Sequence, residues 1–155
     1  MMKTKVRIMI LLVLFTMLTG CAEQSNQPSP ERLQVVNPMM KVSSAQEMAS
    51  YLDFAVPVLD KPVDEYIVLV IDGYPDVGRI YYQDGSVFSM KYGEGDISGI
   101  YGGVPEKEET ICDVPVSFFT FEESGYAIWE KDGFSFSLTG AEQLETEVDA
   151  IIGMG

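Results

Sequence analysis

The sequence contains no histidine, and only two of its 155 residues are cysteine. The absence of histidine excludes Ser-His-Asp and Cys-His catalysis, histidine-ligated metals and an imidazole pH switch. Two cysteines are too few for a disulfide-rich scaffold or for a zinc site built from four thiolates. Basic residues are also scarce, at 10 against 24 acidic ones, and this balance argues against nucleic acid as a partner.

The first twenty residues have the pattern of a signal peptide. Lys3, Lys5 and Arg7 form a basic start, and an apolar run of 11 residues follows from Ile8 to Leu18. As a helix this run is about 16 Å long, far short of the ~20 residues needed to cross a bilayer core. It does match the hydrophobic region of a signal peptide, so we interpret residues 1–20 as one.

The run ends in Leu18-Thr19-Gly20-Cys21, which resembles the lipobox of bacterial lipoproteins. The resemblance implies that the thiol of Cys21 accepts a diacylglyceryl group and becomes the first residue of the mature chain. Two acyl chains suffice for stable anchoring, whereas one is marginal. The expected location is the extracytoplasmic face of the cell membrane. The alternative is an ordinary secretory signal with a chance cysteine.

Residues 21–36 are predicted to form a flexible tether, because the segment Ala22–Gln34 is rich in Gln, Ser, Pro and Asn. Residues 37–155 are expected to form a single domain. Outside residues 1–20 the formal charge is −17, which favours a neutral, basic or cation-bridged partner and disfavours anionic lipid. The alternative is that this charge only maintains solubility.

The domain is expected to be α+β, with an antiparallel meander sheet of about six strands between an N-terminal and a C-terminal helix. Apolar residues recur at helical spacing over 44–53, where Ser43 resembles an N-cap with Gln46 as its capping-box partner, and again from Leu144 to Ile152. Turn signals such as Asp84-Gly85 and Asp132-Gly133 join the expected strands. These strands are Tyr66–Ile71, Val77–Tyr82, Val87–Tyr92, Val114–Phe121, Tyr126–Glu130 and Phe134–Leu138.

The last strand alternates Phe134, Phe136 and Leu138 with serine and threonine. This alternation predicts a strand that is buried on one side and wet on the other. If the helices cover the Phe side, the other side exposes Ser and Thr, with Lys91 or a tyrosine from a neighbouring strand. Such a face could bind a ligand, and the alternative is a solvated face with no ligand.

The segment Gly93–Gly103 is the best local candidate for a contact surface. It begins an 18-residue stretch, Gly93–Thr110, without clear secondary structure, and long loops in compact domains are often functional. Asp96, Ser98 and Tyr101 are its candidate partner-binding residues. Its glycines do not indicate a phosphate cradle, because no helix follows and Glu94 and Asp96 would repel an anion.

No catalytic residue, cofactor or metal is expected. Cys112 lies at a strand start beside acidic residues, which do not activate a thiol. A group of acids follows the long loop, but it lacks the spacing of an EF-hand calcium site. Its members are Glu106, Glu108, Glu109 and Asp113.

The folded part also resembles extracytoplasmic domains of unknown function found in lipoproteins of Gram-positive bacteria and in anti-sigma-factor-like membrane proteins. In that family an Arg often stands where this chain has Lys91. The resemblance implies a small α+β domain with no established activity. It rests on Asn37-Pro38, Val42–Ser44, Arg79–Tyr82, Lys91–Gly93, Trp129, Gly133 and above all the tetrapeptide Asp96-Ile97-Ser98-Gly99.

The sequence therefore favours a non-enzymatic surface lipoprotein, held at the membrane through Cys21, that binds a protein, peptide or envelope component. A regulatory or sensor module acting on a membrane partner is the first alternative. A small hydrolase that uses two carboxylates is the second.

Overall fold

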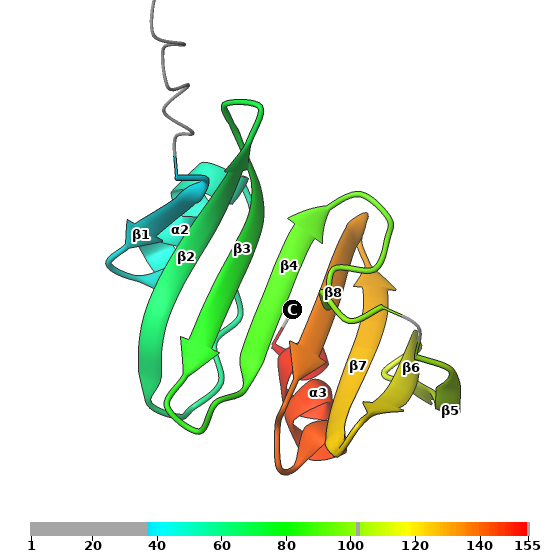
Figure 1. The fold of residues 1–155 in the computed structure, drawn as a ribbon. Coiled ribbons are helices and arrows are strands. Elements are labelled where there is room, and N and C mark those ends of the chain that lie inside the picture. The colour runs from blue at the N-terminus through cyan, green and yellow to red at the C-terminus, as the bar shows by residue number, and fades with distance from the viewer. Residues whose placement is uncertain (1–36, 102, 155) are drawn as a thin grey trace, which may run out of the picture. The chain divides into compact units, whose positions relative to one another are not determined.

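The computed structural model describes residues 37–101 and 103–154. The predicted signal peptide, the tether and Cys21 lie outside these residues. Within the described part, eight strands form one open antiparallel sheet and two helices accompany it (Figure 1). The prediction of an α+β fold with an antiparallel sheet is confirmed.

The elements follow the chain in an order that builds the sheet from two halves. The first half holds β1 (Met39–Val42), α2 (Ala45–Leu52), β2 (Val63–Ile71), β3 (Tyr74–Tyr82) and β4 (Val87–Tyr92). The second holds β5 (Pro105–Ile111), β6 (Val114–Phe121), β7 (Ser124–Lys131), β8 (Phe134–Thr139) and α3 (Leu144–Gly153). The order in space is β1-β2-β3-β4-β8-β7-β6-β5, so each half is a meander and the halves join where β4 pairs with β8.

The expectation of one continuous meander is therefore wrong. After β4 the chain does not add the next strand alongside but crosses to the far edge, where β5 begins. Four strand spacings separate β4 from β5, about 19 Å at 4.8 Å per spacing. The twelve residues between the two strands make this crossing, which explains the length of the loop. Figure 1 shows the loop passing over β8 and β7.

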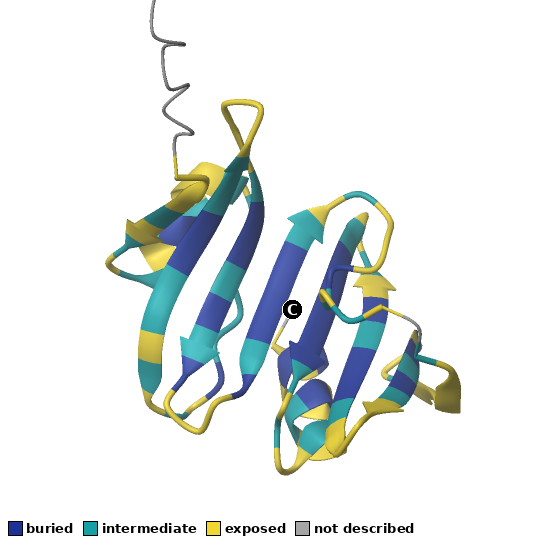
Figure 2. Cartoon of the chain, viewed as in Figure 1, coloured by how far each residue is buried: buried dark blue, intermediate teal, exposed yellow. Residues whose placement is uncertain are grey.

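The sheet also has more strands than the six expected. β1 was missed because it has only four residues, and β5 because its sequence, PEKEETI, is almost wholly exposed and has no apolar alternation. Both lie at the edges of the sheet, where short strands and charged side chains protect unpaired backbone groups from other chains. Figure 2 shows the contrast between the exposed β5 edge and the buried central strands.

Both helices pack against the same hydrophobic cluster on one face of the sheet. α2 contacts β1, β2 and β3, and α3 contacts β7 and β8. The helices contribute Met48, Val148, Ile151 and Ile152 to this core, and the sheet contributes Phe88, Trp129, Phe136 and other residues. Gly78 lets α2 approach β3 closely, since a Cβ there would lie 2.6 Å from Leu52 Cδ1.

The start of α2 differs from the prediction by one residue. Ser44, rather than Ser43, is the N-cap, and its side chain accepts a hydrogen bond of 3.1 Å from the Glu47 N–H. Glu47 in turn accepts from both the backbone N–H and the hydroxyl of Ser43. These two bonds lower the pKa of the Glu47 carboxyl below its ordinary value. The capping box thus uses Glu47 and not Gln46.

No helix within residues 37–101 and 103–154 has the length and apolarity needed to cross a membrane.

Candidate functional site

The face opposite the helices, called the loop face below, is polar at its centre but not wet. Ser135 and Ser137 of β8 project onto it, because Phe136 and Leu138 project into the core on the helix side. Both serines are fully buried, so the expectation of a wet side is wrong. The reason is the crossing loop: the Ser135 hydroxyl donates a hydrogen bond of 2.6 Å to Gly93 O, and Ile97 of the loop is only 8% exposed.

The loop is anchored at both ends. Near its start, the Gly95 N–H donates to the Glu130 carboxylate over 3.3 Å. Near its end, Gly103 lies against Tyr126, whose ring stacks on Phe119 with 4.7 Å between centroids. A Cβ at Gly103 would lie 1.9 Å from Tyr126 Oη, so a larger residue there would displace the Tyr126 side chain. Burial, with a smaller contribution from the Asp96 carboxylate, raises the pKa of Tyr126.

The three candidate residues of the loop are placed differently from one another. Asp96 accepts a hydrogen bond of 2.8 Å from the Ser98 N–H, and the Ser98 hydroxyl accepts one of 3.1 Å from the Ile100 N–H. These two side chains therefore shape consecutive turns. Tyr101 is 92% exposed and is the residue of the three that presents a large side chain to solvent.

A polar row crosses the loop face at its middle. By strand register Arg79 of β3 stands opposite Ser89 of β4, and Ser89 stands opposite Ser137 of β8. Ile67 and Ile128 extend the row on the two sides. The sequence contains these residues on separate strands, and only the pairing of β4 with β8 brings them together.

Two atoms of this row are buried and have no hydrogen-bond partner in the part of the chain that the structure describes. They are Arg79 Nε and Ser137 Oγ. A buried donor left without a partner costs about 1–3 kcal/mol, and more when the group is charged. The two Nη atoms of Arg79 are not among the buried atoms and also form no hydrogen bond within the described residues, so they reach solvent.

Lys91 adds a second positive charge to the same face. It lies two residues beyond Ser89 on β4, so it is a diagonal neighbour of Arg79, at about 7–8 Å between backbones. Neither Arg79 nor Lys91 forms an ion pair within residues 37–101 and 103–154. In the same part of the chain Lys41, Lys61 and Lys107 each pair with a carboxylate, and Lys131 donates to Ile152 O.

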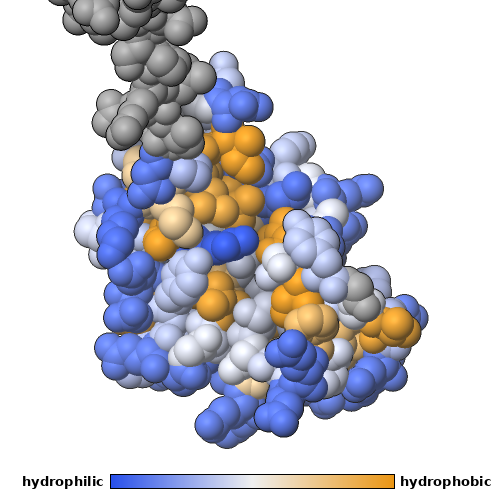
Figure 3. Space-filling view, viewed as in Figure 1, coloured by the Kyte–Doolittle hydropathy of each residue, from blue (hydrophilic) through white to orange (hydrophobic). Residues whose placement is uncertain are grey.

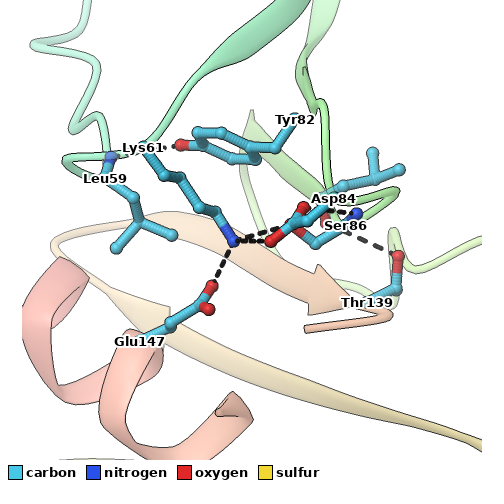
Figure 4. A network of polar contacts seen from close by, with 8 residues as sticks. Leu59, Lys61, Tyr82, Asp84, Ser86, Thr139 and Glu147 are labelled. Atoms are coloured by element: carbon cyan, nitrogen blue, oxygen red, sulfur yellow. Dashed lines mark hydrogen bonds and ion pairs between the residues drawn. The ribbon is translucent and has the colours of Figure 1, made fainter. Parts of the chain in front are cut away.

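Lys61, by contrast, is a cation whose hydrogen-bond donors all have partners (Figure 4). Its ammonium group donates to Asp84 and Ser86, each over 2.8 Å, and to Glu147 over 2.5 Å. It also lies 4.6 Å from the centroid of the Tyr82 ring. Three donors meet three acceptors, so no donor remains for a ligand.

The environment of Lys61 explains two shifted pKa values. Hydrogen bonds from Lys61 and then Ser86 lower the pKa of Asp84 to about 2. Burial raises the pKa of Tyr82 to about 12, although the Tyr82 hydroxyl accepts a hydrogen bond of 3.1 Å from the Leu59 N–H. This cluster joins the segment before β2 to the β3–β4 turn and to α3, and we assign it a structural role.

A hydrophobic cavity of about 300 Å³ lies on the helix side of the sheet. It runs between the segment after α2 and the end of α3. Its lining is mostly apolar and aromatic, and includes Phe54, Trp129, Phe136, Ile151 and Ile152. The charged residues of its lining are Lys131 and Asp132, and the Lys131 ammonium group donates a hydrogen bond of 3.1 Å to Ile152 O.

The structure also shows where the cysteine and the acidic residues considered for catalysis or metal binding lie. Cys112 is a free, exposed thiol in the β5–β6 turn, rather than at the strand start expected, and both Cys112 and Asp113 have positive φ. No group of three or more acidic or cysteine side chains in the described part of the chain is placed to hold a metal ion.

No family model matches the chain, and no curated protein or solved structure matches it either.

Proposed function

We propose that the protein is a non-enzymatic binding module, anchored by lipid on Cys21 at the extracytoplasmic face of the cell membrane, whose contact surface is the loop face. The anchor is supported by the sequence Leu18-Thr19-Gly20-Cys21 after a short apolar run. The contact surface is supported by the geometry of the sheet and of the loop that crosses it.

One observation carries the choice of surface. The chain has 24 acidic residues, yet none of those within residues 37–101 and 103–154 pairs with Arg79 at the centre of this face. A side chain that needed only to pack there could be apolar, since a partly buried charge without a partner is unfavourable. A buried donor without a partner needs an explanation, and a ligand that accepts a hydrogen bond from it supplies one.

The kinds of residue exposed on this surface support the same proposal. Figure 3 shows this face as a mixture of hydrophobic and hydrophilic groups and not as one apolar sheet. The loop adds Tyr101, which is 92% exposed, and Val104, which is 76% exposed. Exposed aromatic groups beside polar donors are common at recognition surfaces.

The anchor is tested by replacing the cysteine. Cys21→Ala should release the protein from the membrane fraction and abolish incorporation of labelled fatty acid. Cys112→Ala is the matched control, because it removes the other cysteine and should change neither result. Equal labelling of Cys21→Ala and wild type would contradict the anchor.

The contact surface is tested by photo-crosslinking in intact membranes. A photoreactive amino acid in place of Tyr101 should yield a discrete crosslinked product. The same amino acid in place of Tyr51, an exposed residue of α2 on the other side of the sheet, is the control and should yield none. The same product from both positions would contradict the choice of the loop face.

A further inference from the structure

We propose that Arg79 binds a carboxylate group of the ligand and that Lys91 supplies a second positive charge beside it. This inference rests on the proposed function, since it names the chemistry that the loop face would recognise.

The guanidinium of Arg79 is a fork of donors that the protein leaves unused. Its Nε is buried without a partner, and its Nη atoms reach solvent without forming a hydrogen bond within the described residues. A planar carboxylate matches two parallel N–H groups of such a fork, whereas a lysine could offer only a point charge. The fold therefore presents at this position the group that is best suited to a carboxylate.

Three carboxylates of the loop face already interact with other groups. Glu65 pairs with Lys41, and Glu130 accepts from the Gly95 N–H. Asp96 in the loop accepts from the Ser98 N–H. Because no carboxylate within residues 37–101 and 103–154 pairs with Arg79, the ligand supplies the acid.

The loop borders the guanidinium. A Cβ placed on Gly99 would lie 3.9 Å from Arg79 Nη2, so the backbone of the loop lies beside this end of the fork. Gly99 has a φ of +76°, a conformation that favours glycine. The ligand site is therefore bounded by the β3–β4 surface on one side and by the loop on the other.

The charge of the whole protein favours a carboxylate over a phosphate. The chain has a formal net charge of −14, which opposes the approach of any anion. The opposition grows with the ligand charge, so a singly charged carboxylate is less disfavoured than a doubly charged phosphate. At physiological ionic strength charges beyond about 8 Å are screened, so Arg79 and Lys91 dominate at contact.

The experiment observes the Nε–H group of Arg79 directly. Full-length protein labelled with ¹⁵N-arginine is kept in a nonionic detergent, and the Nε–H resonance of Arg79 is followed by NMR during titration with sodium acetate. Acetamide is the neutral control of the same shape, and sodium chloride is the control for a nonspecific anion. We expect a saturable shift of this resonance with acetate and none with acetamide or chloride.

Variants separate the fork from its charge. Arg79→Gln and Arg79→Lys are compared with Lys107→Gln, which removes a cation paired elsewhere, and saturation is followed at the neighbouring backbone amides of β4. We expect affinity for acetate to fall about tenfold or more in both Arg79 variants, including the one that keeps the charge, and to stay unchanged in Lys107→Gln. Fluorescence of Trp129 verifies that each variant is folded.

Two further arms identify the source of the carboxylate. A tripeptide with a free C-terminus should shift the Arg79 resonance, and the same tripeptide with an amidated C-terminus should not. Tighter binding of inorganic phosphate than of acetate would overturn the assignment to a carboxylate. An equal response to chloride would also overturn it, because the site would then bind an adventitious ion only. The absence of any saturable shift would also overturn the assignment, because Arg79 Nε would then have only water as a partner. Crosslinking from Tyr101 tests the contact surface independently of this result.

Discussion

Replacement of Lys61 by methionine gives the sharpest test of how this fold is held together. Methionine keeps an unbranched apolar stem but removes the ammonium group, which joins the segment before β2 to the β3–β4 turn and to α3 (Figure 4). The substitution leaves Asp84 and Glu147 facing each other with no cation between them. We therefore expect a loss of stability that exceeds the loss of one surface ion pair.

The magnitude follows from how far the three side chains are buried. The Lys61 side chain is 17% exposed and that of Glu147 is 19% exposed, whereas that of Asp84 is 37% exposed. Breaking a fully buried pair by removing one partner costs about 3–5 kcal/mol, and an exposed pair contributes about 0–1 kcal/mol. This partly buried cluster lies between these limits, so Lys61→Met should lower the free energy of unfolding by about 2–3 kcal/mol.

Urea unfolding monitored by fluorescence measures this loss, because Trp129 is the single tryptophan of the chain and is 3% exposed. The matched control is Lys41→Met, which breaks the pair with Glu65 at a lysine whose side chain is 71% exposed. The control should cost less than about 1 kcal/mol. Equal losses in the two variants would refute the structural role assigned to the Lys61 cluster.

Three further predictions concern stability. Because the pKa of Asp84 is lowered to about 2, the Asp84 carboxylate stabilises the fold above about pH 4, and this stabilisation is lost as the pH falls toward 2. After allowance for screening by solvent, it is about 1 kcal/mol. Unfolding measured at a series of pH values should show this loss in the wild type and not in Lys61→Met. Gly78→Ala should lower the free energy of unfolding by about 1–3 kcal/mol in urea, because its Cβ would lie 2.6 Å from Leu52 Cδ1. Ser137→Ala should leave stability unchanged or raise it by up to about 1 kcal/mol, since it removes a buried hydroxyl that has no partner; a loss would mean that the hydroxyl is satisfied.

Local patterns predicted most of the elements but not their assembly. The turns at Asp84-Gly85 and Asp132-Gly133 and the helical stripes of α2 and α3 depend on neighbouring residues, and the structure confirms them. The pairing of β4 with β8 depends on residues more than forty positions apart, and no short-range signal encodes it. The exposed edge strand β5 was not predicted for another reason: its polar sequence lacks the apolar alternation by which strands are predicted.

The same long-range pairing explains why the sequence pointed to the loop and not to Arg79. The loop was conspicuous because it is long and rich in glycine, yet its length is what a crossing over β8, β7 and β6 requires. Arg79 was inconspicuous because nothing near it in sequence shows that its guanidinium is without a carboxylate. Whether a cation is satisfied depends on every strand that surrounds it, so this kind of site emerges only when the sheet has been assembled.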